Sequence, residues 1–151
     1  MLRMSKLADY STVLVSALAL EPERLYNAKA LAKQVHIAAP TVSKLLKLLL
    51  NAGVVKSVRG VGGGYQLAAA PRDISIAQVV AAIEGKPALT ECSLHTGSCM
   101  QDSVCAIKSN WRTINQLVIS ILENLTLEDM LNPLVDEQPV RFLKNIKNVV
   151  E

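Results

Sequence analysis

Apolar and polar positions alternate with a helical period through the first fifty residues, with two interruptions. Apolar side chains three or four positions apart predict a first helix over about residues 5–20, which Pro22 and its acidic neighbours end. Asn27 is a favourable N-cap for a second, shorter helix over residues 28–35. Both helices are amphipathic, so each is expected to bury one face in a common core.

The third predicted helix has the clearest functional signal in this half of the chain. It follows a three-residue turn, and Pro40 in its first turn and Gly53 beyond its end mark its limits. Its buried stripe consists of Val42, Leu45, Leu46 and Leu49. Its opposite side is small, polar and cationic, and the candidate DNA-contacting residues there are Pro40, Thr41, Ser43, Lys44 and Lys47. Two short helices joined in this way are typical of a helix-turn-helix that enters the major groove of DNA.

After Gly53 the pattern changes to that of a β-hairpin. Residues 54–59 and 65–67 are rich in strand-forming side chains, and five residues between them, four of which are glycine, form a turn. A hairpin directly after a recognition helix is a wing, and Arg59 at its tip is a candidate for the minor groove or for a phosphate. A phosphate-binding enzyme loop is disfavoured, because no Gly-Lys-Ser/Thr follows and no parallel βα unit surrounds the glycines.

The second half combines helices with one long segment that has no periodicity. Ser75 and Gln78 form a capping box for a helix that runs to Glu84. Residues 86–106 have no regular pattern, and a helix is expected over about residues 107–124. The apolar face of this last helix is too broad for one small domain to cover, so it predicts packing against the same helix of a second copy.

The expected fold is therefore mainly α with a small β-hairpin wing. Its expected parts are a winged helix-turn-helix domain, a linker helix with a cysteine loop, dimerisation helices and a C-terminal tail, over residues 1–70, 71–106, 107–131 and 132–151.

Charge separates the two halves of the chain. Residues 1–70 have nine Lys or Arg and three acidic residues, whereas residues 71–151 have seven and ten. A basic module beside an acidic one indicates a polyanion partner, although uneven surface charge alone gives the same numbers.

The N-terminal segment is a weak match to a signal peptide. Arg3 and Lys6 precede the apolar run from Thr12 to Leu20, but Asp9 interrupts the approach and the run is too short to span a membrane. These features and the odd number of cysteines predict that the protein lies in the reducing cytoplasm.

The three cysteines, Cys92, Cys99 and Cys105, all lie within fourteen residues of the segment without periodicity. Zinc sites favour CxxC pairs, which are missing here. Wider spacing on a loop suits an iron–sulfur cluster, because a cluster is larger than a single zinc ion and needs thiolates spread around it. Such a cluster also needs a fourth ligand. The alternative is that the three thiols are unrelated to one another and form no functional site. A thiol redox enzyme is disfavoured by the missing CxxC and by the lack of an obvious His or Asp partner set.

The motifs together resemble those of the iron–sulfur winged-helix regulators of the Rrf2 type, typified by IscR and NsrR. The resemblance covers roughly residues 1–131 and rests on the opening residues 2–10, the wing residues 58–67, the cysteine loop, Trp111-Arg112, and residues 125–130. The opening residues are most similar to those of regulators of the SUF cluster-assembly operon. The resemblance implies a homodimer that binds double-stranded DNA, usually holds a [2Fe–2S] or [4Fe–4S] cluster, and controls cluster-assembly or stress genes.

The fourth cluster ligand differs among these regulators. IscR-type proteins have a histidine where this chain has Lys108, which is a poor ligand. NsrR-type proteins use an aspartate of the first helix, and Asp9 stands at that position. His95, inside the cysteine loop, is the alternative, and Glu91 or an exogenous thiol are further ones. Ser43 replaces an acidic residue that some IscR-type proteins use for base choice, so the operator sequence does not transfer.

We therefore expect a cytoplasmic, homodimeric, DNA-binding transcription regulator that senses cluster status or oxidative or nitrosative stress. Its metal ligands are predicted to be Cys92, Cys99, Cys105 and Asp9, with a [2Fe–2S] cluster favoured over [4Fe–4S]. No catalytic residue, membrane or small-molecule substrate is expected. The alternatives are a winged-helix regulator with zinc or a thiol switch in place of the cluster, and a thiol redox enzyme.

Overall fold

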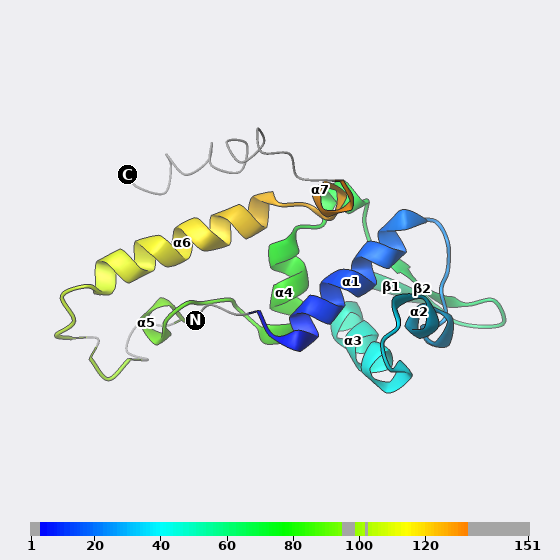
Figure 1. The fold of residues 1–151 in the computed structure, drawn as a ribbon, viewed down its shortest axis with the longest axis horizontal. Coiled ribbons are helices and arrows are strands. Elements are labelled where there is room, and N and C mark those ends of the chain that lie inside the picture. The colour runs from blue at the N-terminus through cyan, green and yellow to red at the C-terminus, as the bar shows by residue number, and fades with distance from the viewer. Residues whose placement is uncertain (1–3, 95–98, 102, 133–151) are drawn as a thin grey trace.

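The computed structural model describes residues 4–94, 99–101 and 103–132. Its elements are α1 (Lys6–Leu20), α2 (Ala28–Val35), α3 (Ala39–Asn51), β1 (Val55–Val58), β2 (Gly64–Leu67), the 3-10 turn η1 (Pro71–Asp73), α4 (Ile76–Glu84), α5 (Glu91–Leu94), α6 (Lys108–Asn124) and α7 (Leu127–Leu131) (Figure 1). The prediction of a mainly helical fold with one β-hairpin is confirmed.

The core is built almost entirely from aliphatic side chains of α1 to α4, together with α7 and the hairpin. Its largest fully buried members are Leu14, Leu18, Leu31, Leu45, Leu46, Leu49 and Leu127. Helix α4 adds Ile76, Val79 and Val80 to the same core, so it packs as part of the winged-helix domain. Burying aliphatic surface is the main stabilising contribution to such a domain.

Local signals determine where the first helices begin and end. The Ser5 side chain accepts a hydrogen bond from the Ala8 N–H and starts α1, and the Asn27 Oδ1 accepts one from the Ala30 N–H at 2.7 Å and starts α2. His36 ends α2 in the left-handed region, with φ of +54°. Pro40 lies in the first turn of α3, as the sequence predicts.

Strands β1 and β2 pair antiparallel as the predicted wing, with Val55 opposite Leu67 and Val58 opposite Gly64. The wing is anchored to the segment between α1 and α2, because Tyr26 and Tyr65 exchange main-chain hydrogen bonds of 3.0 and 2.8 Å. A Cβ on Gly64 would lie 2.7 Å from the main chain of Tyr26, so only glycine allows this close approach.

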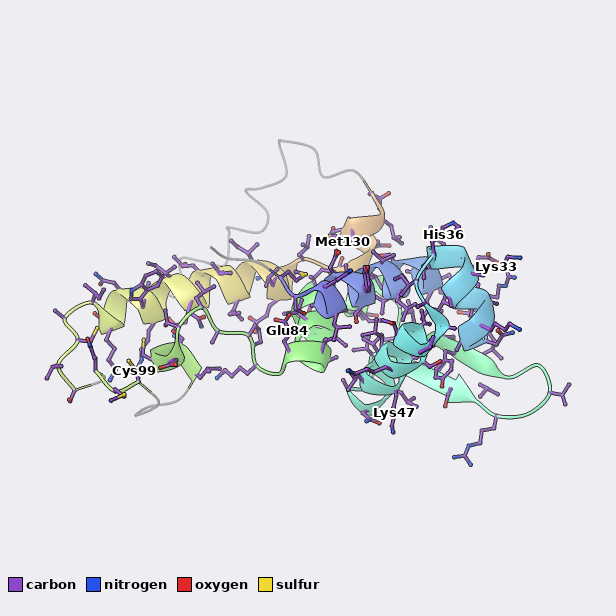
Figure 2. All side chains as sticks on the ribbon, turned by 60° about the horizontal axis from the view of Figure 1, so that its bottom comes forward. Lys33, His36, Lys47, Glu84, Cys99 and Met130 are labelled. Atoms are coloured by element: carbon purple, nitrogen blue, oxygen red, sulfur yellow. The ribbon has the colours of Figure 1, made fainter. Side chains whose placement is uncertain are left out.

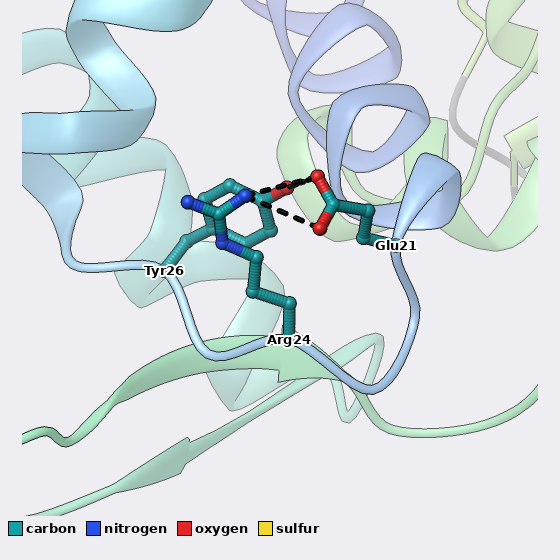
Figure 3. A network of polar contacts seen from close by, with 3 residues as sticks. All are labelled: Glu21, Arg24 and Tyr26. Atoms are coloured by element: carbon teal, nitrogen blue, oxygen red, sulfur yellow. Dashed lines mark hydrogen bonds and ion pairs between the residues drawn. The ribbon is translucent and has the colours of Figure 1, made fainter.

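The side chain of Tyr26 adds a polar contact to this anchor (Figure 3). Its ring is 3% exposed, and its hydroxyl donates a hydrogen bond of 3.0 Å to the Glu21 carboxylate at the end of α1. The Arg24 guanidinium donates to the same carboxylate and lies 4.7 Å from the centre of the Tyr26 ring. Burial, followed by the hydrogen bond to Glu21, raises the pKa of Tyr26 above its ordinary value of 10.0.

Helix α6 touches the winged-helix domain at one end only. Leu122 and Leu125 pack against the core, and the Leu125 carbonyl accepts a hydrogen bond from the Ile76 N–H at 2.8 Å. From there α6 extends away from the domain, and its first turns lie beside α5 and the cysteine loop (Figure 1). Helix α5, four residues long, was not predicted, because so short a helix has no periodicity to detect.

In the part of the chain that the structure describes, no helix has both the length and the apolar character needed to cross a lipid bilayer.

Candidate functional site

The predicted recognition helix has the two faces that the sequence indicates. Its apolar stripe is fully buried, whereas Pro40, Ser43, Lys44 and Lys47 are exposed and Thr41 is half-buried. Figure 2 shows Lys47 on the outer side of α3, away from the core. A rigid helix therefore presents small and cationic side chains to solvent, as insertion into the major groove requires.

The wing presents a second exposed surface next to this helix. Arg59 and Lys56 are exposed, and Val61 at the tip has no shielding at all. Gly60 and Gly62, on either side of Val61, have φ of +107° and +82°, which side chains rarely tolerate. Val61 was not among the predicted contacts, because an apolar side chain gives no charge signal. Its position suits van der Waals contact with the walls of the minor groove.

The three cysteines lie at the opposite end of the molecule from the wing, where Figure 2 labels Cys99. None of the three forms a disulfide. Cys92 lies in α5 and is buried, whereas Cys99 and Cys105 are half-buried in the loop before α6. The burial of Cys92 is not indicated by the segment without periodicity in which the sequence places all three thiols.

Several polar groups surround Cys92. The Thr90 Oγ1 lies 3.2 Å from the Cys92 Sγ and 2.9 Å from the Ser93 Oγ. The Arg112 Nε donates a hydrogen bond of 3.1 Å to the Cys92 carbonyl, and the Asn115 Oδ1 accepts one of 2.9 Å from the Leu89 N–H. The sequence alone assigned no contact or role to Arg112 or Asn115. The available signal was a row of polar residues on one side of a helix whose other side is apolar.

The cysteine loop contains the donor atoms that a metal cluster needs. Three free thiols on one short segment supply the donors that iron–sulfur clusters use. Among the described residues, however, no three His, Cys, Asp or Glu side chains come together closely enough to hold a metal ion. The three thiols therefore share one segment of the chain and supply suitable donor chemistry, without forming such a group among the described residues.

Of the two main candidates for the fourth ligand, Asp9 and His95, only Asp9 is among the described residues. Asp9 lies in the first turn of α1 and is exposed. The beginning of that helix is tied to α4, because the Ser5 N–H donates to the Glu84 carboxylate at 3.1 Å. His95 lies outside the described residues.

Comparisons with known proteins identify the family. The Rrf2 family, described as iron-dependent transcriptional regulators, matches residues 4–133. The chain is 32% identical to the HTH-type transcriptional regulator NsrR of Halalkalibacterium halodurans, over 97% of this chain and 99% of that protein. It is 34% identical to IscR of Vibrio vulnificus, over 64% of this chain and 56% of that protein.

Solved structures agree with this result. The T. potens IscR structure covers 86% of both chains at 30% identity with a TM-score of 0.67. The structure of CymR, described as the global cysteine regulator of B. subtilis, covers 87% of this chain and 97% of its own at 28% identity with a TM-score of 0.70. The predicted winged-helix, DNA-binding regulator is confirmed, and the chain belongs to the Rrf2 family of transcriptional regulators.

Proposed function

We propose that this regulator acts as a homodimer whose DNA binding responds to an iron–sulfur cluster held by Cys92, Cys99 and Cys105. The observation that supports this most strongly is the placement of three free thiols on one loop, directly before the long helix α6. A cluster would supply iron–thiolate bonds that join three points of the loop. Loss of those bonds would release the loop and change how α6 is held.

The second copy is proposed to pack on α6. Ile107 at its start, and Trp111 and Ile114 in its first two turns, are 54%, 37% and 42% exposed. Large apolar side chains in a row on a protruding helix favour a protein partner, and symmetric pairing of identical patches is the commonest way to cover them.

Asp9 is proposed as the fourth ligand, contributed by the partner subunit. Within one chain, Asp9 is not part of any group of metal-ligating side chains among the described residues. A second copy crossing at α6 can bring its α1 to the protruding cysteine loop. A carboxylate from α1 would connect the loop of one subunit with the DNA-binding domain of the other, and its release would change the spacing of the two α3 helices.

Anaerobic purification tests the cluster. We expect a brown protein with visible absorbance bands of the [2Fe–2S] type and matching iron and sulfide contents. Cys99→Ala and Cys105→Ala should lose most of the iron, whereas Ser103→Ala, at an exposed position of the same loop, should retain it. Full iron and sulfide content in a Cys99→Ala/Cys105→Ala double variant would refute the proposed ligand set.

A heterodimer tests whether Asp9 acts between subunits. One subunit has Asp9→Ala with intact cysteines, and the other has Cys99→Ala with intact Asp9. If Asp9 acts across the interface, one complete site remains and the dimer holds one cluster. If Asp9 acts within its own subunit, no complete site remains. Equal clusters in Asp9→Ala and wild-type homodimers, with loss in His95→Ala, would assign the ligand to His95 instead.

A cluster-free thiol switch is the second candidate, because all three thiols here are free. It predicts a colourless anaerobic protein whose DNA affinity changes when the thiols are oxidised. Stoichiometric zinc in that colourless protein would select the zinc alternative. The proposed target genes of the cluster form are those for iron–sulfur cluster assembly, which transcript measurements in a deletion strain would test.

A further inference from the structure

One face of α6 is directed toward α4 and α5 and differs chemically from its exposed apolar face. A groove of about 1160 Å³ runs between these helices, and α6 lines it with Arg112, Asn115, Gln116, Ile119, Ser120 and Glu123. Residues three, four and seven positions apart share one side of a helix, so Arg112, Asn115 and Ile119 form a row. The exposed residues Trp111 and Ile114 belong to a different row.

Asn115 is the unusual member of this row, since its side chain is only 7% exposed. A buried amide without hydrogen-bond partners destabilises the folded state. The Asn115 Oδ1 has such a partner, because it accepts a hydrogen bond of 2.9 Å from the Leu89 N–H. One turn earlier, the Arg112 Nε donates to the Cys92 carbonyl at 3.1 Å. Both bonds reach the main chain of the segment that begins the cysteine loop, twenty or more residues away in sequence.

We propose that Arg112 and Asn115 are positioning residues that hold the main chain of residues 89–92 against α6 and thereby place Cys92 for cluster binding. This inference rests on the proposed function. Bonds to the main chain fix the path of the segment whatever the state of the thiol. They hold the one buried cysteine of the three, whereas Cys99 and Cys105 are half-buried in the loop before α6.

The same two residues connect the loop with the dimer surface. Arg112 and Trp111 are neighbours in α6, so a movement of the Cys92 carbonyl acts on the helix turn that offers Trp111 to the second copy. The Arg112 bond therefore links the segment that contains Cys92 with the turn of α6 that carries the exposed Trp111.

Hydrogen exchange of the cluster-free full-length protein tests the main-chain bonds. In Asn115→Leu and in Arg112→Met, amides of residues 89–94 are expected to exchange roughly three- to tenfold faster, which corresponds to the loss of one hydrogen bond. Arg112→Lys, which keeps a donor, should fall between Arg112→Met and wild type. Gln116→Ala, at an exposed position of the same groove, should match wild type.

Unchanged exchange in both Asn115→Leu and Arg112→Met would overturn the proposal. Thermal unfolding monitors the fold in parallel, and if Asn115→Leu does not fold, the comparison of Arg112→Met with Arg112→Lys decides, because Arg112 is only half-buried.

Measurements on the cluster-loaded protein separate the positioning of Cys92 from a purely structural role of the two residues. Arg112→Met and Asn115→Leu are expected to show altered visible circular dichroism of the cluster and faster loss of iron to a chelator, with Gln116→Ala again as control. Wild-type spectra and rates in both variants would overturn the positioning role. A wild-type protein that never acquires a cluster would instead refute the proposed function, so the two failures are distinct.

Discussion

Tyr26 joins three parts of the winged-helix domain. Its hydroxyl contacts Glu21 at the end of α1, its main chain pairs with Tyr65 of the wing, and the next residue, Asn27, caps α2. Because the ring is nearly fully buried, the neutral phenol is favoured in the folded state. The wing is therefore anchored to the rest of the domain through one buried tyrosine that is not among the predicted DNA-contacting residues.

The raised pKa of Tyr26 gives a prediction for alkaline solutions. The unfolded chain loses the phenol proton near the ordinary value of 10.0, while the folded chain keeps it to higher pH. The contribution of this group to the free energy of unfolding is thus complete below pH 10 and is lost as pH rises above it. Denaturant unfolding between about pH 9 and 11 should show a smaller decline in Tyr26→Phe than in wild type. Tyr10→Phe is the control, and equal declines in all three proteins would contradict the prediction.

Lys44 and Arg59 are predicted to contact DNA from two different elements. If Lys44 in α3 mainly meets a phosphate, Lys44→Ala should weaken binding similarly on all sequences and lower the salt slope by about one. A base contact would instead cost roughly 1–3 kcal/mol and relax specificity at one position.

Arg59→Ala in the wing should also weaken binding, and neither variant should change dimerisation. Fluorescence anisotropy at several salt concentrations measures both effects, with Lys86→Ala, outside the predicted interface, as control. Unchanged affinity in both variants would mean that the DNA-binding face is misassigned.

At the scale of elements, the sequence predicts well what local chemistry determines. The N-caps Ser5, Asn27 and Ser75, and the glycines of the wing, act within a few residues of their own position, and the structure confirms the elements they delimit. Helix α5 is different, because its four residues are held by contacts with α6 rather than by their own pattern. The roles of Arg112 and Asn115 were equally out of reach, since their partners are distant in sequence. The cysteines were proposed as ligands from their spacing in the sequence, whereas the burial of Cys92 is a tertiary property.

Helix α4 offers a direct test of such a local signal. The Ser75 hydroxyl accepts the Gln78 N–H at 3.2 Å, and the Gln78 side chain accepts the Ser75 N–H at 2.9 Å. Ser75→Ala removes half of this capping box and should lower the free energy of unfolding by about 1 kcal/mol. Ser57→Ala, at an exposed serine of β1, controls for the loss of a hydroxyl. Equal stability of Ser75→Ala and wild type in urea would show that tertiary packing alone holds the start of α4.

On the scale of the whole molecule, the structure is one compact domain with a single protruding arm. The predicted DNA-binding face of α3 and the wing lies at one end, and the cysteines lie at the other, near the tip of α6 (Figures 1 and 2). A signal at the loop therefore has to cross the length of the molecule to alter DNA binding within one chain. The proposed packing of a second copy along α6 would shorten that path, because it would bring a partner domain to the arm.

The protruding arm leads to the last prediction, which concerns assembly. Ile114 is 42% exposed in the single chain, so Ile114→Asp introduces no buried charge into the isolated protomer. In a dimer that pairs through α6, the same aspartate would be buried without a partner, at a cost of several kcal/mol. Sedimentation at micromolar concentration should therefore show a dimer for wild type and a monomer for Ile114→Asp. Gln116→Asp, on the groove side of the same helix, should remain dimeric. Circular dichroism should show the same helix content in all three proteins, which separates lost assembly from lost folding. A monomeric wild type, or a dimeric Ile114→Asp, would exclude α6 as the interface and with it the supply of Asp9 from the partner subunit.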